Sequence, residues 1–195
     1  MNIILASSSP RRRELLGMLG WPFSVDVSDA KETSVTGEKP RDMVCRLARL
    51  KAETVYKRNV DSWVVGADTT VAINDEILGK PGNLRDAERM ISTLSGKTHS
   101  VFTGVALFSP ASGSIVKAEE TRVRFRDLSD EEVRGYVSLG ESMDKAGAYA
   151  IQEKGALLVS EITGCYFNVV GLPIYLLSDM FSKLGFPLTE QWRLK

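Results

Sequence analysis

The most informative stretch of the chain reads Leu5-Ala6-Ser7-Ser8-Ser9-Pro10-Arg11-Arg12-Arg13-Glu14-Leu15-Leu16. An apolar run predicts a strand up to Leu5, and Pro10 suits the first position of a helix because its missing N–H would be unpaired there. Ser9 is a suitable N-cap. The start of such a helix exposes backbone N–H groups and the positive end of the helix dipole, and arginines follow at once. The stretch therefore predicts a site for an anion, phosphate above all.

Strands and helices alternate along the rest of the chain. Helical spacing and capping residues predict helices over 10–19, from Pro40 to about Val55, over 84–95, from Ser129 to about Leu139, and over 173–184. Strands are predicted over 3–5, 23–27, 63–67 with a continuation at 71–73, 98–108, 115–126, 157–159 and 166–170. Residues 28–39 are predicted as a loop, and 74–76 and 109–114 as turns. This order predicts an α/β fold with a mixed sheet, as one domain over residues 1–195.

Composition narrows the function classes. The chain has 195 residues, with 25 Lys plus Arg against 25 Asp plus Glu, so its formal net charge is zero. A general nucleic-acid or membrane-surface protein would carry a basic excess, which argues against both classes. The two cysteines lack paired or metal-ligand spacing, which favours a reduced, cytoplasmic setting. No apolar run approaches the length of a membrane span.

Asp68 is the first candidate for chemistry, because it follows the buried run 63–67, at the carboxyl end of a strand where α/β sheets gather ligands. A carboxylate there can bind a divalent cation or take a proton from water, although it can equally cap a turn. Several cations lie near predicted element ends, and with one or two carboxylates they make up a metal–polyphosphate site. These cations are Arg11, Arg12, Lys51 and Lys80. Judged alone, Lys51 is better explained as part of a solvated helix face, and Glu32 as an acid of a solvated loop.

The segment Asp144–Gln152 is the second candidate. Its small residues suit close approach to a ligand, and the Gln152 amide can read the edge of a base, although a tight packing corner is the alternative. His99 is the only histidine, and no nucleophile motif accompanies it. We interpret His99 as structural, and zinc is disfavoured because too few Cys and His are present.

Six motifs occur in order along the chain. They are Ala6-Ser7-Ser8-Ser9-Pro10-Arg11-Arg12, Gly66-Ala67-Asp68-Thr69, Gly79-Lys80-Pro81, Leu94-Ser95-Gly96-Lys97-Thr98-His99, residues 144–152 (D-K-A-G-A-Y-A-I-Q) and residues 164–173 (G-C-Y-F-N-V-V-G-L-P). Together they resemble the Maf family of nucleoside triphosphate pyrophosphatases, from Leu5 to Leu177. Ala150 departs from the pattern, since relatives commonly carry glycine there.

The resemblance implies a Maf/inosine-triphosphatase-like α/β fold, with an elongated mixed sheet flanked by helices and two lobes separated by a cleft. It implies hydrolysis of a nucleoside triphosphate to the monophosphate and pyrophosphate, with Mg²⁺ or Mn²⁺. The 144–152 segment looks like that of the subgroup that acts on dTTP and UTP. The substrates implied in this way include modified pyrimidine nucleotides. The resemblance further implies a homodimer that binds a nucleoside triphosphate. With the composition above, we expect it in the cytoplasm, with no membrane and no specific nucleic-acid partner. The alternative is a nucleotide-binding regulator of cell division or septum formation with little hydrolysis.

Residue by residue, the resemblance implies four roles. Asp68 is the proton acceptor. Substrate specificity is assigned to Arg12, Thr69 and Gln152, and phosphate binding to Ser7, Arg11, Lys51 and Lys80. Glu32 and Asp68 are implied to hold the metal.

Overall fold

The computed structural model describes residues 1–33, 35–74, 76–111 and 113–195. Its elements are, in chain order, β1 (Ile3–Leu5), α1 (Pro10–Gly17), β2 (Ser24–Val25), α2 (Pro40–Tyr56), β3 (Trp63–Ile73), β4 (Glu76–Leu78), α3 (Leu84–Leu94), β5 (Thr98–Ser109), β6 (Gly113–Phe125), α4 (Asp130–Ser138), η1 (Ala146–Ala148), η2 (Glu153–Leu158), β7 (Val159–Thr163), α5 (Tyr166–Val170), α6 (Ile174–Lys183) and α7 (Leu188–Gln191). The two η elements are 3₁₀-helices.

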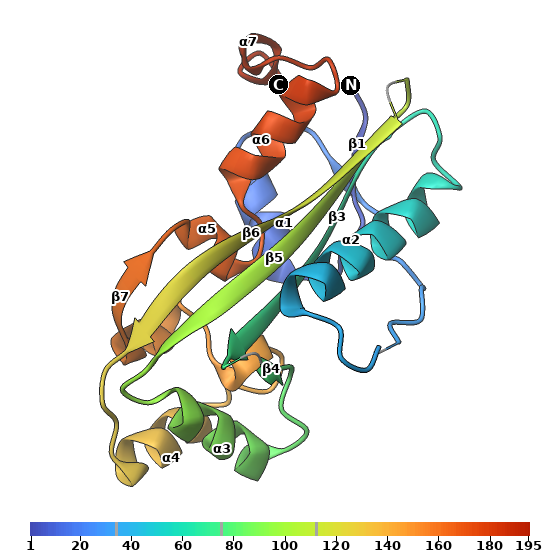
Figure 1. Cartoon of the computed structure of the whole chain (residues 1–195). Coiled ribbons are helices and arrows are strands. Elements are labelled where there is room, and N and C mark those ends of the chain that lie inside the picture. The colour runs from blue at the N-terminus through green and yellow to red at the C-terminus, as the bar shows by residue number, and fades with distance from the viewer. Residues whose placement is uncertain (34, 75, 112) are drawn as a thin grey trace. The chain divides into compact units, whose positions relative to one another are not determined.

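The strands pair into one seven-stranded sheet in the order β2-β1-β3-β5-β6-β7, with β4 on β3 (Figure 1). Strand β1 is parallel to β2 and to β3, with Leu5 opposite Val25 and Val65. Strand β4 is antiparallel to β3, and β7 is antiparallel to β6. The predicted α/β fold with a mixed sheet flanked by helices is therefore confirmed.

The chain forms two compact units. The first unit contains Met1–Asp68, Thr103–Glu119 and Gly171–Lys195, and the second contains Thr69–Phe102 and Glu120–Val170. Strands β3, β5 and β6 contribute residues to both units.

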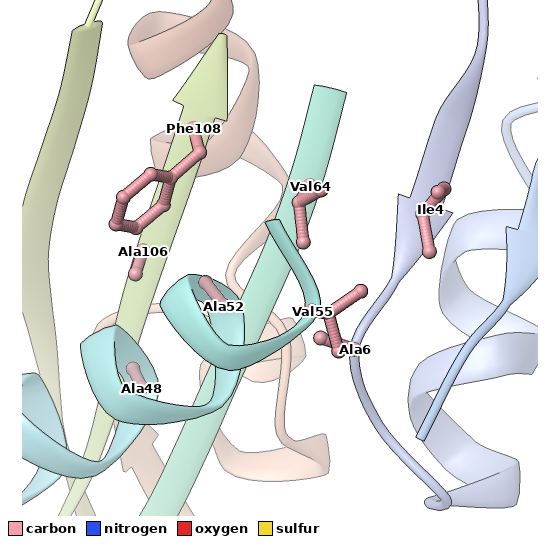
Figure 2. Close-up of a cluster of buried hydrophobic side chains, with 8 residues drawn as sticks. All are labelled: Ile4, Ala6, Ala48, Ala52, Val55, Val64, Ala106 and Phe108. Atoms are coloured by element: carbon pink, nitrogen blue, oxygen red, sulfur yellow. The ribbon is translucent and has the colours of Figure 1, made fainter. Parts of the chain in front are cut away.

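The core of the first unit holds helix α2 against strands β1, β3 and β5. Figure 2 shows the buried cluster from these elements, made up of Ile4, Ala6, Ala48, Ala52, Val55, Val64, Ala106 and Phe108. Its helix residues are mostly alanine. Because these side chains are small, the backbone of α2 packs close to the strands.

Two glycines let the backbone of α2 approach the sheet. A Cβ at Gly66 on β3 would collide with the Ala48 carbonyl oxygen and with Ala52. A Cβ at Gly104 on β5 would collide with the backbone of Val44. Because only glycine fits at both contacts, the position of α2 on the sheet is fixed by these two residues.

The C-terminal residues complete the first unit. Leu172, Leu177 and Phe181 are fully buried, and the Phe181 ring lies 5.0 Å from that of Trp63 on β3. The buried Gln191 amide donates to the Phe186 carbonyl oxygen at 2.9 Å. These contacts fasten α6 and α7, and they hold the segment that precedes α6 at Gly171.

The second unit is organised around a ring cluster. His99 on β5, Phe125 on β6 and Tyr149 after η1 meet edge to face, with ring centroids 4.7–5.4 Å apart. Helices α3 and α4 belong to the same unit and lie side by side (Figure 1). The aromatic cluster therefore packs the 144–152 segment onto the strands of this unit.

The predicted helix starts are confirmed at their capping residues. Ser9 caps α1, with Pro10 at the first helical position. Pro40 likewise opens α2. Ser129 and Glu132 form a reciprocal capping box at the start of α4. Local chemistry alone settles these boundaries.

Three strand predictions differ from the structure, one of them over its whole length. Strand β3 does not end at residue 67 but continues to Ile73, where β4 pairs with it, so Asp68 lies within the strand. The predicted strand 166–170 is helix α5, in which the buried Asn168 amide donates to the Val101 carbonyl oxygen at 2.9 Å. The residues predicted to open the strand at 157 end η2 instead, and β7 begins at Val159.

The predicted turns over 74–76 and 109–114 contain Asp75 and Ser112, and the loop 28–39 contains Ser34. These three residues lie outside the described ones. Among the residues that the structure describes, no helix has both the length and the apolar character needed to span a bilayer.

Candidate active site

Two serines shape the turn that joins β1 to α1. The Ser9 hydroxyl accepts a hydrogen bond from the backbone N–H of Arg12 at 3.5 Å, and the Ser7 hydroxyl accepts from the backbone N–H of Ser9 at 3.2 Å. Ser7 is buried, and Pro10 follows at the first helical position. The turn therefore has the form that the sequence predicts, with a helix N-terminus behind the first arginines.

Arg12 is held at two points. Its Nη1 donates to the Ser7 hydroxyl at 3.2 Å, and its Nε donates to the carbonyl oxygen of Gly171 at 2.9 Å. One planar guanidinium thus joins the beginning of the chain to the segment before α6. Lysine has no such fork, because its ammonium is a point donor on a flexible stem.

Arg12 also lies within electrostatic reach of two carboxylates. Desolvation lowers the pKa of its guanidinium, the Asp68 carboxylate raises that pKa, Arg11 lowers it, and the Glu32 carboxylate raises it. The guanidinium nevertheless stays charged at any physiological pH. The N-terminal arginines and Asp68 therefore belong to one electrostatic cluster of the first unit.

Lys51 lies between two carboxylates. Its Nζ is 2.7 Å from Oδ1 of Asp68 and 3.0 Å from Oε1 of Glu32. The side chains of Lys51 and Asp68 are 14% and 13% exposed, while that of Glu32 is 49% exposed. Lys51 thus does not lie on a solvated helix face, and Glu32 joins a cluster that loop sequence alone would not reveal.

The packing of α2 explains how Lys51 reaches Asp68. Side chains two residues apart on a strand point to the same face, so Gly66 and Asp68 share one face of β3. Helix α2 lies on that face at Gly66 through Ala48 and Ala52. Lys51 comes from the same turn of the helix, and its ammonium meets Asp68 beyond the glycine.

Two arginines, Arg46 on α2 and Arg58 just after its C-cap, fasten the segment that carries Glu32. Arg46 forms a forked pair with Glu38, at 2.7 and 2.6 Å, and its Nη2 donates to the Thr33 carbonyl oxygen at 3.2 Å. Arg58 forms a second forked pair with Asp26, at 2.9 and 2.6 Å. Hydrogen bonding to these arginines lowers the pKa of Glu38 and of Asp26. The chain is therefore held on both sides of Glu32, by Arg58 at Asp26 and by Arg46 at Thr33 and Glu38.

The second unit contains the remaining candidates, Thr69 on β3, Lys80 and Gln152. The backbone N–H of Gly147 donates to the Gly79 carbonyl oxygen at 3.0 Å, so the segments that carry Lys80 and Gln152 are joined. A Cβ at Gly147, whose φ is +68°, would collide with Val71. The segment 144–152 therefore does form a tight packing corner, as the alternative interpretation expected. The same contacts bring it next to the segment that carries Lys80.

The backbone on either side of Gln152 is strained. Ala148 has φ +63° and Glu153 has φ +54°, values that residues other than glycine rarely adopt. Ala150 lies outside that left-handed region. Gln152 itself is partly exposed, and its side chain makes no capping hydrogen bond to η2.

Two tyrosines hold this strained segment. The Tyr136 hydroxyl accepts from the backbone N–H of Ala150 at 3.2 Å, and burial raises the pKa of Tyr136 to about 12. The Tyr149 hydroxyl and Nε2 of His99 share a hydrogen bond at 2.8 Å. His99 is 2% exposed, and its burial lowers its pKa to about 4, so it is neutral at pH 7. These contacts agree with our interpretation of His99 as structural.

The donor set of the first unit fits a magnesium-type ion. Such an ion is commonly bound by one or two carboxylates together with substrate phosphates, and keeps several waters. Glu32 and Asp68 already converge on one cation, the Lys51 ammonium. Among the described residues there is no group of three or more His, Cys, Asp or Glu side chains placed to hold a metal by themselves. The pair therefore suits an ion that a phosphate ligand completes.

Sequence reasoning missed the residues that position the site. Gly171 contributes its carbonyl oxygen, which no side-chain pattern reveals. Arg46 lies in an ordinary amphipathic helix and Arg58 just after it, and their partners Glu38 and Asp26 lie 8 and 32 positions away. Gly66 gave a usable signal, because a glycine inside an apolar strand indicates close approach of another backbone.

The profile of the family described as Maf-like protein matches residues 2–184. The chain belongs to the Maf family.

Curated relatives of this Maf protein align along nearly its whole length. A dTTP/UTP pyrophosphatase of Symbiobacterium thermophilum is 48% identical over 186 residues, 95% of each chain. One of Geotalea uraniireducens is 49% identical over 185 residues, 94% of this chain and 95% of that one. One of Myxococcus xanthus is 48% identical over 191 residues, 98% and 95%. Among solved structures, the Staphylococcus aureus Ham1 protein aligns with a TM-score of 0.49 and 16% identity, over 65% of this chain and 73% of that one.

Proposed function

We propose that this Maf protein hydrolyses dTTP and UTP, and modified pyrimidine nucleotides of the same shape, to the nucleoside monophosphate and pyrophosphate. Relatives with nearly half of their residues identical over almost the full length are named dTTP/UTP pyrophosphatases. The structural observation that carries the proposal is the cluster in which Lys51 joins Asp68 to Glu32, within reach of Arg12. It combines carboxylates with cations, as cleavage of a phosphoanhydride requires.

In this proposal the cations bind the triphosphate and Asp68 handles the proton. Ser7, Arg11, Lys51 and Lys80 bind phosphate oxygens, on which negative charge grows as the anhydride breaks. Asp68 takes a proton from the attacking water, which adds across the bond between the α and β phosphates. The partly buried position of Asp68 beside an ammonium keeps the carboxylate in place for that step.

Glu32 and Asp68 would also hold the divalent cation, Mg²⁺ or Mn²⁺. When bound, such an ion would neutralise phosphate oxygens. It would thereby stabilise the negative charge that develops on them and lower the activation barrier for cleavage of the anhydride. The half-exposed side chain of Glu32 and the largely buried one of Asp68 supply the oxygen ligands that these ions prefer.

Base preference is assigned to Arg12, Thr69 and Gln152. A uracil or thymine ring offers two carbonyl acceptors and one N–H, and a side-chain amide complements that edge with one donor and one acceptor group. The strained backbone beside Gln152 fixes where its amide is presented.

We also propose that the protein acts in the cytoplasm as a homodimer, with no specific nucleic-acid partner. Its zero formal net charge supports the last point, since backbone phosphates attract basic proteins.

Pyrophosphate release tests the proposed activity. Purified protein is assayed with dTTP, UTP, CTP and 7-methylguanosine triphosphate, with and without Mg²⁺, alongside Asp68→Asn. Asp61→Asn is the matched control, because Asp61 is an exposed carboxylate before the same strand. We expect dTTP and UTP to be favoured and Asp68→Asn to lose about 10²–10⁴-fold in turnover with its fold retained. Near-normal turnover by Asp68→Asn would refute the role of Asp68, and nucleotide binding without hydrolysis by the wild type would favour a regulatory protein.

A further inference from the structure

The position between Glu32 and Asp68 is held by the protein's own cation. The Lys51 ammonium contacts both carboxylates, at 3.0 and 2.7 Å. These are the same two carboxylates that we propose as ligands of a divalent metal. The site of the metal and the site of the ammonium therefore overlap.

The packing of α2 holds Lys51 in this position, and its side chain is largely shielded from solvent. Its helix is seated on the sheet at Gly66 and Gly104, where no Cβ fits, and its side chain is 14% exposed. Arg46 fastens the loop that brings Glu32 to the ammonium. The fold itself thus brings the three charged groups together.

An ammonium and a divalent cation cannot both sit against these oxygens at low cost. Like charges at contact distance repel strongly in a partly buried site, where water screens them poorly. A metal that binds Glu32 and Asp68 must therefore displace Lys51. The displaced ammonium is then free to meet an anion, and a phosphate group is such an anion.

We infer that Lys51 is a built-in competitor of the metal, so that metal and triphosphate bind cooperatively. In the free protein, Lys51 neutralises the two carboxylates and weakens their affinity for the metal. A bound triphosphate gives the ammonium another partner, which releases the carboxylates, and by linkage each ligand strengthens the binding of the other. This inference rests on the proposed metal role of Glu32 and Asp68, but its first test requires no hydrolysis.

The first experiment titrates Mn²⁺ into nucleotide-free protein and follows the heat of binding. Lys51→Met removes the charge and keeps a long apolar stem. Lys57→Met is the matched control at the C-cap of the same helix, because Lys57 is exposed and its ammonium pairs with Glu53. We expect Lys51→Met to bind Mn²⁺ about tenfold more tightly than the wild type, since it loses a competing unit charge at contact distance. Lys57→Met should match the wild type.

The second measurement is thermal unfolding in EDTA and in excess Mn²⁺. Without metal, Lys51→Met leaves two carboxylates facing each other, so its midpoint should fall below that of the wild type. Mn²⁺ should raise the midpoint of Lys51→Met more than it raises that of the wild type, because binding to the folded state stabilises it. If Lys51→Met does not fold, Lys51→Gln keeps a neutral polar side chain and replaces it in both experiments.

The third measurement adds a dUTP analogue with a non-hydrolysable α–β bridge. The analogue should tighten Mn²⁺ binding in the wild type by a larger factor than in Lys51→Met, where nothing has to be displaced. Equal or weaker Mn²⁺ affinity in Lys51→Met than in the wild type would overturn the competition and leave the proposed hydrolysis untouched. A protein that shows the competition but releases no pyrophosphate would overturn the hydrolysis alone.

Discussion

Arg12 donates its Nε hydrogen to the carbonyl oxygen of Gly171 at 2.9 Å, across 159 positions of the sequence. Gly171 has φ +123°, a backbone conformation that residues other than glycine rarely adopt. The residue after it, Leu172, is fully buried. The end of the chain therefore determines where a guanidinium from its beginning is held.

Arg12→Lys tests whether this fork matters to activity. A lysine cannot donate to Ser7 and to Gly171 in the same planar arrangement. We expect kcat/KM for dTTP to fall by about 10–100-fold, as for the loss of hydrogen bonds to a charged group. Steady-state kinetics of Arg12→Lys measure the change, with Arg13→Lys as the exposed neighbouring control. Unchanged kinetics of Arg12→Lys would show that the charge suffices without the fork.

Gln152→Leu tests base recognition. Leucine is similar in size and has no hydrogen-bonding group, so discrimination among dTTP, UTP and CTP should weaken by about tenfold. Stability should hardly change, because the Gln152 side chain makes no capping hydrogen bond to η2. Competition assays with nucleotide pairs give the ratios, and the exposed Lys154→Gln serves as control. Ratios identical to the wild type would exclude Gln152 from recognition.

His99 predicts a pH-dependent stability. Burial lowers its pKa from 6.5 to about 4 in the folded protein. Between these values the unfolded chain binds a proton that the folded protein does not, so stability falls as pH drops below 6.5. The difference of about 2.5 units corresponds to roughly 3 kcal/mol of unfolding free energy lost by about pH 4.

Urea unfolding of the wild type and His99→Gln at several pH values measures this effect. Glutamine is neutral at every pH and retains a partner for the Tyr149 hydroxyl. The difference in unfolding free energy between the two proteins should therefore shift in favour of the variant as pH falls from 7 toward 4. A constant difference would show that His99 is not buried in its neutral form.

Gly104→Ala tests the seating of α2. The added Cβ would overlap the carbonyl group of Val44, which is backbone and cannot swing aside. We expect a loss of at least about 2 kcal/mol of unfolding free energy. Gly135→Ala is the contrasting control, since its Cβ meets open space within helix α4 and should stabilise by about 0.5–1 kcal/mol. Chemical denaturation of both variants decides, and a neutral Gly104→Ala would disprove the close contact.

The sequence predicted features whose cause lies within a few residues. Ser9 and Pro10 start α1, and Ser129 with Glu132 starts α4, because the capping groups are local. The six motifs likewise indicated the Maf family, because each is a pattern of neighbouring residues. The strand predicted over 166–170 failed because a short apolar run suits a buried strand and a buried helix equally, and the partners of Asn168 at Val101 and Thr121 are remote.

The amino-acid sequence by itself determined the family, the succession of helices and strands, and the kinds of charged group available. These depend on neighbours along the chain, whose spacing is read directly. The tertiary structure decided which charges meet. Lys51 became the shared partner of Glu32 and Asp68 only because Gly66 and Gly104 admit the backbone of α2 to the sheet. Such meetings depend on packing between distant segments, which the order of residues does not display.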